Sequence, residues 1–157
     1  HRSSGYARTP HGAAQSRPMQ RKAFDHDDTA ILRATIAPVA ADPAGFGRLF
    51  YRRLFDRAPA VRSMFPVDPG AQERKLAETL VVMTRCLDEP DGVEPLLRRL
   101  GEQHRDIGAL TAHYNVVGYV LLEALAEVNG ALFAARAQQA WRGLYGRTVA
   151  AMQSAAR

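Results

Sequence analysis

From Asp25 onward, apolar side chains recur every three or four residues, which is the spacing of one face of an α-helix. No stretch shows the sustained alternation of apolar and polar residues that a half-buried strand requires. Asp, Pro and Gly interrupt the apolar pattern at intervals of ordinary helix length and mark where helices begin and end. The pattern therefore predicts a single all-α domain of about seven helices.

The expected helices are defined by their end signals and by their apolar stripes. In the first half we expect a helix from Asp27 or Asp28 toward Val39 that Pro38 bends or ends, a helix from Asp42-Pro43 to just before Pro59, a short turn over 60–65 and a long helix carrying Leu76, Leu80, Met83 and Leu87. In the second half we expect three helices, with breaks near Gly108 and at Asn129-Gly130. The first carries Leu97, Leu100, His104 and Ile107 on one face, and the second spans about Ala112 to Val128. The third carries Ala137, Trp141, Leu144, Thr148 and Met152.

The formal charge of +5 belongs to one end of the chain. Residues 1–24 hold five of the 21 Lys and Arg residues and no acid, so residues 25–157 carry 16 basic and 16 acidic side chains. This balance argues against a nucleic-acid-binding body. Residues 1–24, rich in Ser, Gly, Pro and Gln, predict a disordered basic extension before a domain over 25–157. Since the chain begins at His1, we expect part of the extension to be non-native, with Met19 as a candidate start.

The rest of the composition narrows the setting of the protein. Cys86 is the single cysteine, so it cannot form an internal disulfide, and its apolar neighbours predict a buried small side chain. No apolar run approaches the ~20 residues that span a bilayer, and no signal peptide is visible. We therefore expect a cytoplasmic protein that binds neither membranes nor nucleic acid.

His104 is the residue whose position is hardest to explain by packing alone. It lies in line with Leu97 and Leu100 on an apolar helix face, where an imidazole needs a hydrogen-bond partner or a metal. Both readings stay open on spacing alone. No second His, Cys or carboxylate lies three or four positions away on that face, which argues against a zinc site made by protein ligands. A lone histidine facing an apolar pocket suits haem, which brings its own equatorial ligands.

Tyr51 and Gln72 are polar residues on or beside otherwise apolar stripes. Each could be a core residue whose polar end is hydrogen-bonded, the usual state of a buried tyrosine. Together they offer a hydroxyl and an amide donor that could converge across a cavity from His104. Such donors stabilise the negative charge that develops on oxygen bound to haem iron.

The chain resembles the bacterial haemoglobins, that is, the flavohaemoglobins and their single-domain relatives such as the Vitreoscilla type. The resemblance covers about residues 27–155, and its blocks recur in family order except for a shortened loop between Phe65 and Gln72. The blocks are Phe50-Tyr51-Arg52-Arg53-Leu54-Phe55, Ala58 to Phe65, Gln72-Glu73-Arg74-Lys75-Leu76, Leu100-Gly101-Glu102-Gln103-His104, His113-Tyr114-Asn115-Val116-Val117-Gly118, and Ala140-Trp141 with Tyr145.

The resemblance implies a globin fold around a haem b pocket and a role for each matching residue. His104 corresponds to the proximal iron ligand, Tyr51 to the distal tyrosine that hydrogen-bonds oxygen, and Gln72 to its amide companion. The remaining matches are pocket residues: Leu76 over the distal face, Phe65 against the haem ring, and Phe50, Val117, Leu121, Tyr145 and Tyr114 along the lining. His113 stands at a helix start, where we expect it to be exposed or to cap the helix.

One departure from the family concerns the last helix. In the family, a glutamate near the end of that helix pairs with the proximal histidine and with the tyrosine that matches Tyr114. This chain has Ala156 at the corresponding position and no acid between Tyr145 and the C-terminus. A carboxylate partner raises the basicity of an imidazole ligand, so its absence puts the strongly redox-active haem of flavohaemoglobins in doubt.

Three functions remain open at this point. The first is reversible binding of oxygen or another diatomic gas, for delivery, storage or scavenging, by a monomer or homodimer. The second is a nitric oxide dioxygenase, which would take electrons from a separate reductase because we expect no reductase domain in this chain. The third is a gas sensor that reports the state of its haem to a partner.

Overall fold

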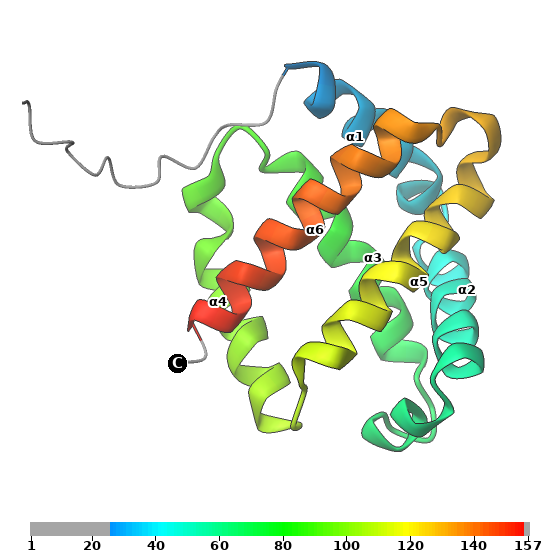
Figure 1. The fold of residues 1–157 in the computed structure, drawn as a ribbon, viewed down its shortest axis with the longest axis vertical. Helices are drawn as coiled ribbons and strands as arrows, with labels where there is room; N and C mark the ends of the chain where they lie inside the picture. The colour runs from blue at the N-terminus through cyan, green and yellow to red at the C-terminus, as the bar shows by residue number, and fades with distance from the viewer. Residues whose placement is uncertain (1–25, 156–157) are drawn as a thin grey trace, which may run out of the picture.

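The computed structural model describes residues 26–155, and within that range it contains six α-helices, two short 3-10 helices and no strand (Figure 1). The predicted all-α class is confirmed. The proposed extension over 1–24 lies outside the described residues, as do Ala156 and Arg157. In chain order the elements are α1 (His26–Ala41), α2 (Pro43–Arg57), η1 (Pro59–Met64), α3 (Gly70–Arg85), α4 (Pro90–Asp106), α5 (Thr111–Asn129), η2 (Gly130–Leu132) and α6 (Ala135–Ala155).

Most helix ends follow the signals in the sequence. Asp42 caps α2, and its side chain accepts a hydrogen bond from the Gly45 backbone N–H at 3.0 Å, with Pro43 in the first turn. The breaks on either side of α5 fall at Gly108 and Gly130, whose φ angles are +80° and +59°. Other residues adopt such left-handed conformations only at a cost, so glycine suits both turns.

Of the two outcomes expected at Pro38, the structure excludes the ending: α1 continues to Ala41, and the fully buried Val39 anchors its last turn in the core. Two other local expectations were wrong. Ile107 is 52% exposed, because α4 ends one residue before it and the inward stripe ends with the helix. Cys86 is only half-buried, because it stands at the C-terminal cap of α3.

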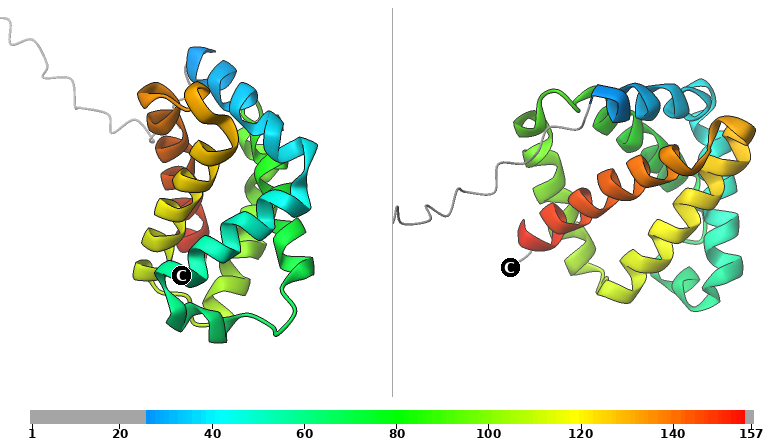
Figure 2. Two further views of the ribbon diagram at one scale, coloured as in Figure 1. Left: turned by 90° about the vertical axis from the view of Figure 1, so that its right-hand side faces the viewer. Right: turned by 45° about the horizontal axis from the view of Figure 1, so that its top comes forward.

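The helices form two layers. Seen edge-on, α5 and α6 lie on one side of the molecule, and α1, α2 and α3 lie on the other (Figure 2). α2 packs against both α3 and α5, so it joins the layers, while α4 packs mainly on α6. This arrangement places the end of α4 opposite the α2–α3 pair.

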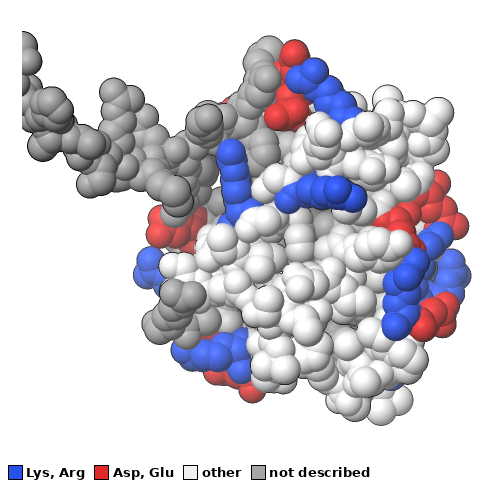
Figure 3. Space-filling model, in the orientation of Figure 1, with Lys and Arg blue, Asp and Glu red and all other residues white. Residues whose placement is uncertain are grey.

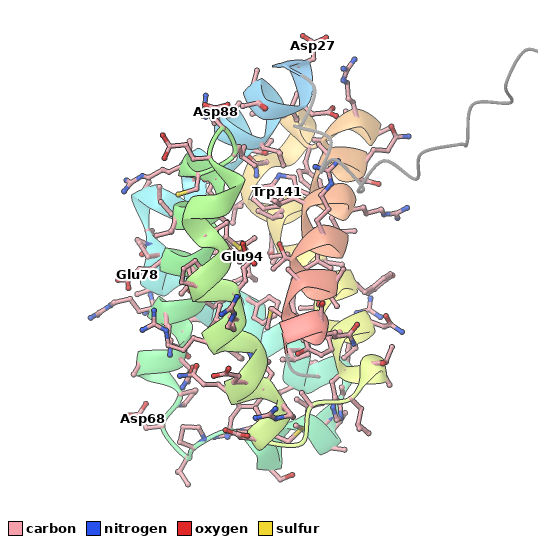
Figure 4. All side chains as sticks on the ribbon, turned by 90° about the vertical axis from the view of Figure 1, so that its left-hand side faces the viewer. Asp27, Asp68, Glu78, Asp88, Glu94 and Trp141 are labelled. Atoms are coloured by element: carbon pink, nitrogen blue, oxygen red, sulfur yellow. The ribbon has the colours of Figure 1, made fainter. Side chains whose placement is uncertain are left out.

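A buried polar network fastens α1 to α6 in the core. Trp141 on α6 is 1% exposed, and its indole N–H donates to the Thr35 hydroxyl at 2.7 Å. Asn129, the last residue of α5, ties that helix to the same residue, because its side-chain amide donates to the Thr35 backbone carbonyl at 2.9 Å. Figure 4 shows Trp141 between the helices, whereas the labelled acids Asp27 and Asp88 lie at the outside.

The surface carries paired charges. Arg53 on α2 donates to Glu123 and Glu127 on α5 at 2.9 Å each, and Arg57 also pairs with Glu123. On the face shown in Figure 3, acids and bases lie side by side at the margins, and the lower middle is largely uncharged. No helix in the described range is both long and apolar enough to cross a membrane.

Candidate functional site

His104 lies in the last turn of α4 and is half-buried. Its Nδ1 is 2.6 Å from the backbone carbonyl oxygen of Leu100. A carbonyl can only accept, so this contact places the ring proton on Nδ1 and leaves the lone pair on Nε2. The imidazole is therefore oriented and in the tautomer that a metal ligand needs. The contact also satisfies one ring nitrogen, as the core-histidine reading required.

Two tyrosines connect His104 to α5 and α6. The Tyr114 ring stacks on the imidazole, with centroids 5.9 Å apart and planes 27° from parallel. The Tyr145 hydroxyl donates to the backbone carbonyl of Tyr114, so α6 fixes the segment of α5 that carries this ring. Burial raises the pKa of both hydroxyls, which therefore remain protonated at neutral pH.

Gly118 makes the α5–α6 contact possible. A Cβ atom at this position would lie 2.5 Å from Cε1 of Tyr145, closer than carbon atoms can approach. The glycine in the Tyr114 to Gly118 block is thus explained by the ring that packs over it. The four-residue separation of Tyr114 and Gly118 places both on the side of α5 that faces Tyr145, which hydrophobic periodicity alone does not reveal.

Tyr51 on α2 occupies an aromatic cluster. Its ring centroid lies 5.1 Å from that of Phe50, 5.8 Å from Phe55 and 5.2 Å from Phe65. The side chain is 7% exposed, and its hydroxyl makes no hydrogen bond to any described residue. Burial first, and the nearby Glu73 carboxylate second, raise the pKa of Tyr51 to about 12. At neutral pH this hydroxyl is a neutral donor, and no residue over 26–155 accepts its proton.

Gln72 and Glu73 lie in the first turn of α3, where the loop from Phe65 is short. Gln72 is exposed and is not hydrogen-bonded to Tyr51, so the structure does not bring the expected pair together. Glu73 is half-buried, and its carbonyl oxygen would lie 2.1 Å from a Cβ on Gly47. Gly47 is one turn before Tyr51, so this close crossing sets α3 beside the tyrosine. Glu73 is therefore a polar neighbour of Tyr51, although no pattern in the sequence marks it as one.

The expected pocket residues fall into two groups by burial. Phe50 and Leu121 are buried in the core at 1% and 3% exposure. Phe65, Leu76 and Val117 are half-buried and pack on that core from its edge. The second group therefore presents apolar surface that a flat apolar cofactor could cover.

Arg62 holds the segment that leads from Phe65 toward α3. Its guanidinium donates to the backbone carbonyls of Pro66 and Val67 at 2.9 and 2.8 Å, and lies 5.0 Å from the centre of the Phe55 ring. A surface arginine has no distinguishing pattern in sequence, so its role was not predicted. His113 caps α5, since its Nδ1 accepts from the Leu110 backbone N–H at 2.9 Å.

The donor set fits haem better than a protein-only metal site. In the described part of the chain, no three His, Cys, Asp or Glu side chains gather closely enough to hold a metal ion. The described residues offer the His104 imidazole, whose Nε2 carries a lone pair, and the neutral Tyr51 hydroxyl, whose proton no described residue accepts. They also offer half-buried apolar surface, such as the Phe65 ring. These suit a cofactor that supplies its own equatorial ligands and lies between the two polar groups.

Comparison with known proteins gives a consistent result. A family model described as Globin matches residues 48–152. A flavohemoprotein of Chromobacterium violaceum is 28% identical over 120 residues, which cover 74% of this chain and 30% of that protein. The chain thus spans about a third of the length of the curated relatives it matches.

Two solved structures share the architecture. An engineered carbene transferase, described as a candidate nitric oxide dioxygenase from Rhodothermus marinus, superposes with a TM-score of 0.76 and 26% identity, covering 84% of this chain and 92% of that one. A flavohemoglobin from Malassezia yamatoensis with bound FAD and heme superposes with a TM-score of 0.74 and 22% identity, covering 85% and 36%. At that identity the second likeness speaks for the fold alone.

Proposed function

Because the chain belongs to the globin family, we propose that it binds haem b through His104 and uses that haem to bind oxygen reversibly. The predicted globin fold and the resemblance to bacterial haemoglobins are confirmed by the family match and by the shared architecture. The assignment of particular residues to the haem is our proposal. A cytoplasmic setting, which suits the single Cys86, is part of the same proposal.

The observation that carries the proposal is the hydrogen bond between His104 Nδ1 and the Leu100 carbonyl. It fixes the ring on its helix and leaves Nε2 as the atom that would hold the iron. When bound, haem supplies the iron centre at which a diatomic gas binds. Stacking by Tyr114 and the Tyr145 contact behind it keep the imidazole from turning away.

On the opposite side, Tyr51 would donate its hydroxyl proton to the polar end of the gas. Its raised pKa keeps this proton in place at physiological pH. The Phe50, Phe55 and Phe65 rings pack around the Tyr51 ring and make its surroundings largely apolar. A hydrogen bond formed in such surroundings stabilises charge more strongly than one formed in water. Gln72, Leu76 and Val117 remain proposed neighbours of the gas and the haem.

The partner of His104 also favours reversible binding over catalysis. That partner is a neutral backbone carbonyl, and the sequence holds no acid after Glu127. A neutral acceptor increases the electron donation of an imidazole less than a carboxylate does. We therefore place oxygen binding ahead of electron-transfer chemistry for this chain.

A nitric oxide dioxygenase is the second candidate. The relatives named flavohemoprotein and the Rhodothermus marinus structure favour it. In that case the electrons would come from a reductase. The choice between the two candidates depends on whether the protein oxidises nitric oxide repeatedly or only once per haem.

The haem assignment is tested by the visible spectrum of the purified protein. We expect a Soret band in the wild type, loss of the protein–iron bond in His104→Ala, and an unchanged spectrum in His113→Ala, whose ring caps α5 instead. Absence of the band after hemin is added would refute haem binding. An unchanged iron ligation in His104→Ala would refute the choice of ligand.

The second experiment separates carrier from enzyme. Oxygen-saturated protein is mixed with nitric oxide in the presence of a supplied reductase and nicotinamide cofactor. A single stoichiometric oxidation supports the carrier. Sustained consumption of nitric oxide, with nitrate formed over many turnovers, would establish the enzyme instead.

A further inference from the structure

The first turn of α3 crosses α2 one turn before Tyr51. A Cβ atom on Gly47 would lie only 2.7 Å from the Cα of Glu73, so the two backbones are in contact at this point. In the described range α2 packs more extensively on α3 than on any other element. The crossing therefore holds Glu73 at a fixed place against α2.

The Tyr51 side chain lies beside this crossing. Residues four apart share one face of an α-helix, so Gly47 and Tyr51 are neighbours on α2. Side chains of a helix lean toward its N-terminus, which brings the Tyr51 phenol toward the turn that contains Gly47. Because Gly47 has no side chain, the residue that fills this space comes from α3, and that residue is Glu73.

Glu73 brings a carboxylate that no ion pair neutralises. It is half-buried, whereas Gln72 and Arg74 on either side of it are exposed. Within residues 26–155, no lysine, arginine or histidine lies within 4.0 Å of its carboxylate. Arg62, which lies over the Phe55 ring of the same aromatic cluster, donates to loop carbonyls instead. The negative charge of Glu73 is therefore available to act on Tyr51.

The effect of this charge is visible on the Tyr51 hydroxyl. Burial is the larger cause of the raised pKa of Tyr51, and the Glu73 carboxylate is the second cause and the only charged group involved in the described range. A group that accepts a hydrogen bond from the phenol oxygen lies one hydrogen bond away from it. Coulomb energy falls only with the inverse of distance, so a carboxylate that opposes charge on the phenol also opposes charge on that acceptor.

We propose that Glu73 is a specificity-determining residue that reduces the preference of the gas site for oxygen over carbon monoxide. Oxygen gains negative charge when it binds haem iron, whereas carbon monoxide gains little. Tyr51 stabilises that charge by donating its proton, and the Glu73 carboxylate opposes it. This inference rests on the proposed function, which assigns Tyr51 to the side of the haem where the gas binds.

The test compares gas dissociation in the wild type and in Glu73→Gln, which keeps the shape of the side chain and removes its charge. Stopped-flow displacement of oxygen by carbon monoxide, and of carbon monoxide by nitric oxide, gives the two rates. We expect oxygen to dissociate about three- to tenfold more slowly in Glu73→Gln, with the carbon monoxide rate unchanged. A loosened pocket would change both rates together, so their ratio separates a charge effect from a structural one.

Glu78→Gln is the matched control. Glu78 is an exposed acid on the same helix and lies at the outer edge of the molecule in Figure 4. The substitution removes the same charge from α3 away from Tyr51, so we expect both rates to stay at wild-type values. An unchanged oxygen rate in Glu73→Gln, a parallel change of both gases, or equal changes in the two variants would overturn the proposal.

A second measurement does not depend on haem. The full chain is labelled with 3-fluorotyrosine, whose phenol ionises at lower pH than that of tyrosine, and the Tyr51 signal is assigned by its loss in Tyr51→Phe. Fluorine NMR should show the acid dissociation constant of this phenol rising about threefold in Glu73→Gln and staying constant in Glu78→Gln. An unchanged constant in Glu73→Gln would also overturn the proposal.

The two measurements distinguish this proposal from the haem proposal. If the purified chain shows no Soret band after hemin is added, the proposed function fails and the gas preference fails with it. The fluorine titration still reports in that case whether the Glu73 charge acts on Tyr51. If the band is present and the ratio of the two rates stays the same, the role of Glu73 fails alone.

Discussion

At the scale of single residues, Tyr51 holds the most consequential proton in the site. It is buried among three phenylalanine rings, yet no described residue accepts its hydrogen bond. A buried tyrosine usually has a partner for its hydroxyl. Under the proposed function, that partner would be the bound gas.

Tyr51→Phe removes that donor and keeps the ring. We expect oxygen to dissociate faster by roughly 10- to 100-fold, because a hydrogen bond to a charged or strongly polarised acceptor contributes about 1.5–3 kcal/mol. Stopped-flow displacement of oxygen by carbon monoxide measures the rate. Phe55→Leu, which changes the same cluster without removing a donor, serves as the control. An unchanged rate in Tyr51→Phe would mean that the hydroxyl faces elsewhere.

The same hydroxyl makes stability depend on pH at the alkaline end. Its pKa is about 12 when folded, against an ordinary value of 10.0. Between these values the folded state keeps a proton that the unfolded state releases, so the free energy of unfolding falls as pH rises through this window. The loss approaches about 2–3 kcal/mol and is absent below pH 10. Urea unfolding at pH 9 to 11.5 should show a steeper fall in the wild type than in Tyr51→Phe, in which the raised pKa values of Tyr114 and Tyr145 still contribute. Equal slopes would contradict it.

At the scale of elements, Arg62 determines how α3 begins. Three backbone carbonyls after η1 accept from one guanidinium, which organises a loop with no regular structure of its own. The loop carries Phe65 at its start and leads into Gln72 and Glu73. A half-buried side chain thereby positions Phe65 and Glu73, which both lie near Tyr51.

Arg62→Ala should loosen this loop while the rest of the fold stays intact. We expect amides over 65–73 to exchange with solvent about fivefold faster, which corresponds to about 1 kcal/mol for bonds that are partly solvent-exposed. Hydrogen-exchange mass spectrometry measures the effect. Arg52→Ala, an exposed arginine on α2, is the matched control. Equal exchange in both variants would show that the loop is held by its prolines.

The α1–α6 junction also depends on one side chain, that of Thr35. Its hydroxyl accepts from Trp141 and donates to the Ile31 carbonyl at 2.7 Å each, in surroundings that exclude water. Thr35→Val keeps the shape and leaves the indole N–H unsatisfied. We expect a loss of about 1–3 kcal/mol in the free energy of unfolding.

Chemical denaturation of Thr35→Val checks this loss. Thr79→Val is the control, because its hydroxyl bonds only to a carbonyl of its own helix. A similar loss in both variants would mean that the Trp141 contact adds little beyond the helix-internal bond.

The helix boundaries are easier to predict from the sequence than the contacts between the helices. Capping by Asp42 and the breaks at Gly108 and Gly130 follow from local chemistry, so they are readable in one chain. The persistence of α1 through Pro38 is not, because it depends on packing around Val39 from other helices. Thr35, Arg62 and Glu73 escaped notice for the same reason: their partners lie on other elements or on a loop without a pattern.

The candidate site shows the same division. His104 was selected because a polar residue interrupted an apolar stripe, and Tyr51 because it stood beside one. The side chain of Gln72 was expected to face Tyr51, yet it lies exposed in the first turn of α3. The direction of a side chain near a helix start depends on the loop before it, and this loop is the shortened one. Sequence separation alone could not supply that direction.

At the scale of the whole molecule, charge and fold are separate properties. The net charge of +5 equals the five basic residues of 1–24, while the domain from Asp25 onward is formally neutral.

A chain that begins at Asp25 should therefore keep its function. We expect its Soret spectrum and its oxygen dissociation rate to match those of the full chain, while its isoelectric point falls by several units toward neutrality. Spectrophotometry and isoelectric focusing test both statements. A change in the oxygen dissociation rate after truncation would give the extension a role at the site.

The hydrogen bond from His104 to Leu100 has a consequence for how this protein can change. Its acceptor belongs to the main chain, so no replacement of the Leu100 side chain removes it. Mutation can surround the imidazole with new side chains, but the proton stays on Nδ1 as long as α4 remains a helix. The tautomer and the electron donation of the proposed iron ligand are therefore maintained in any variant that keeps α4 helical. Substitution could increase that electron donation by placing an acidic residue beside His104.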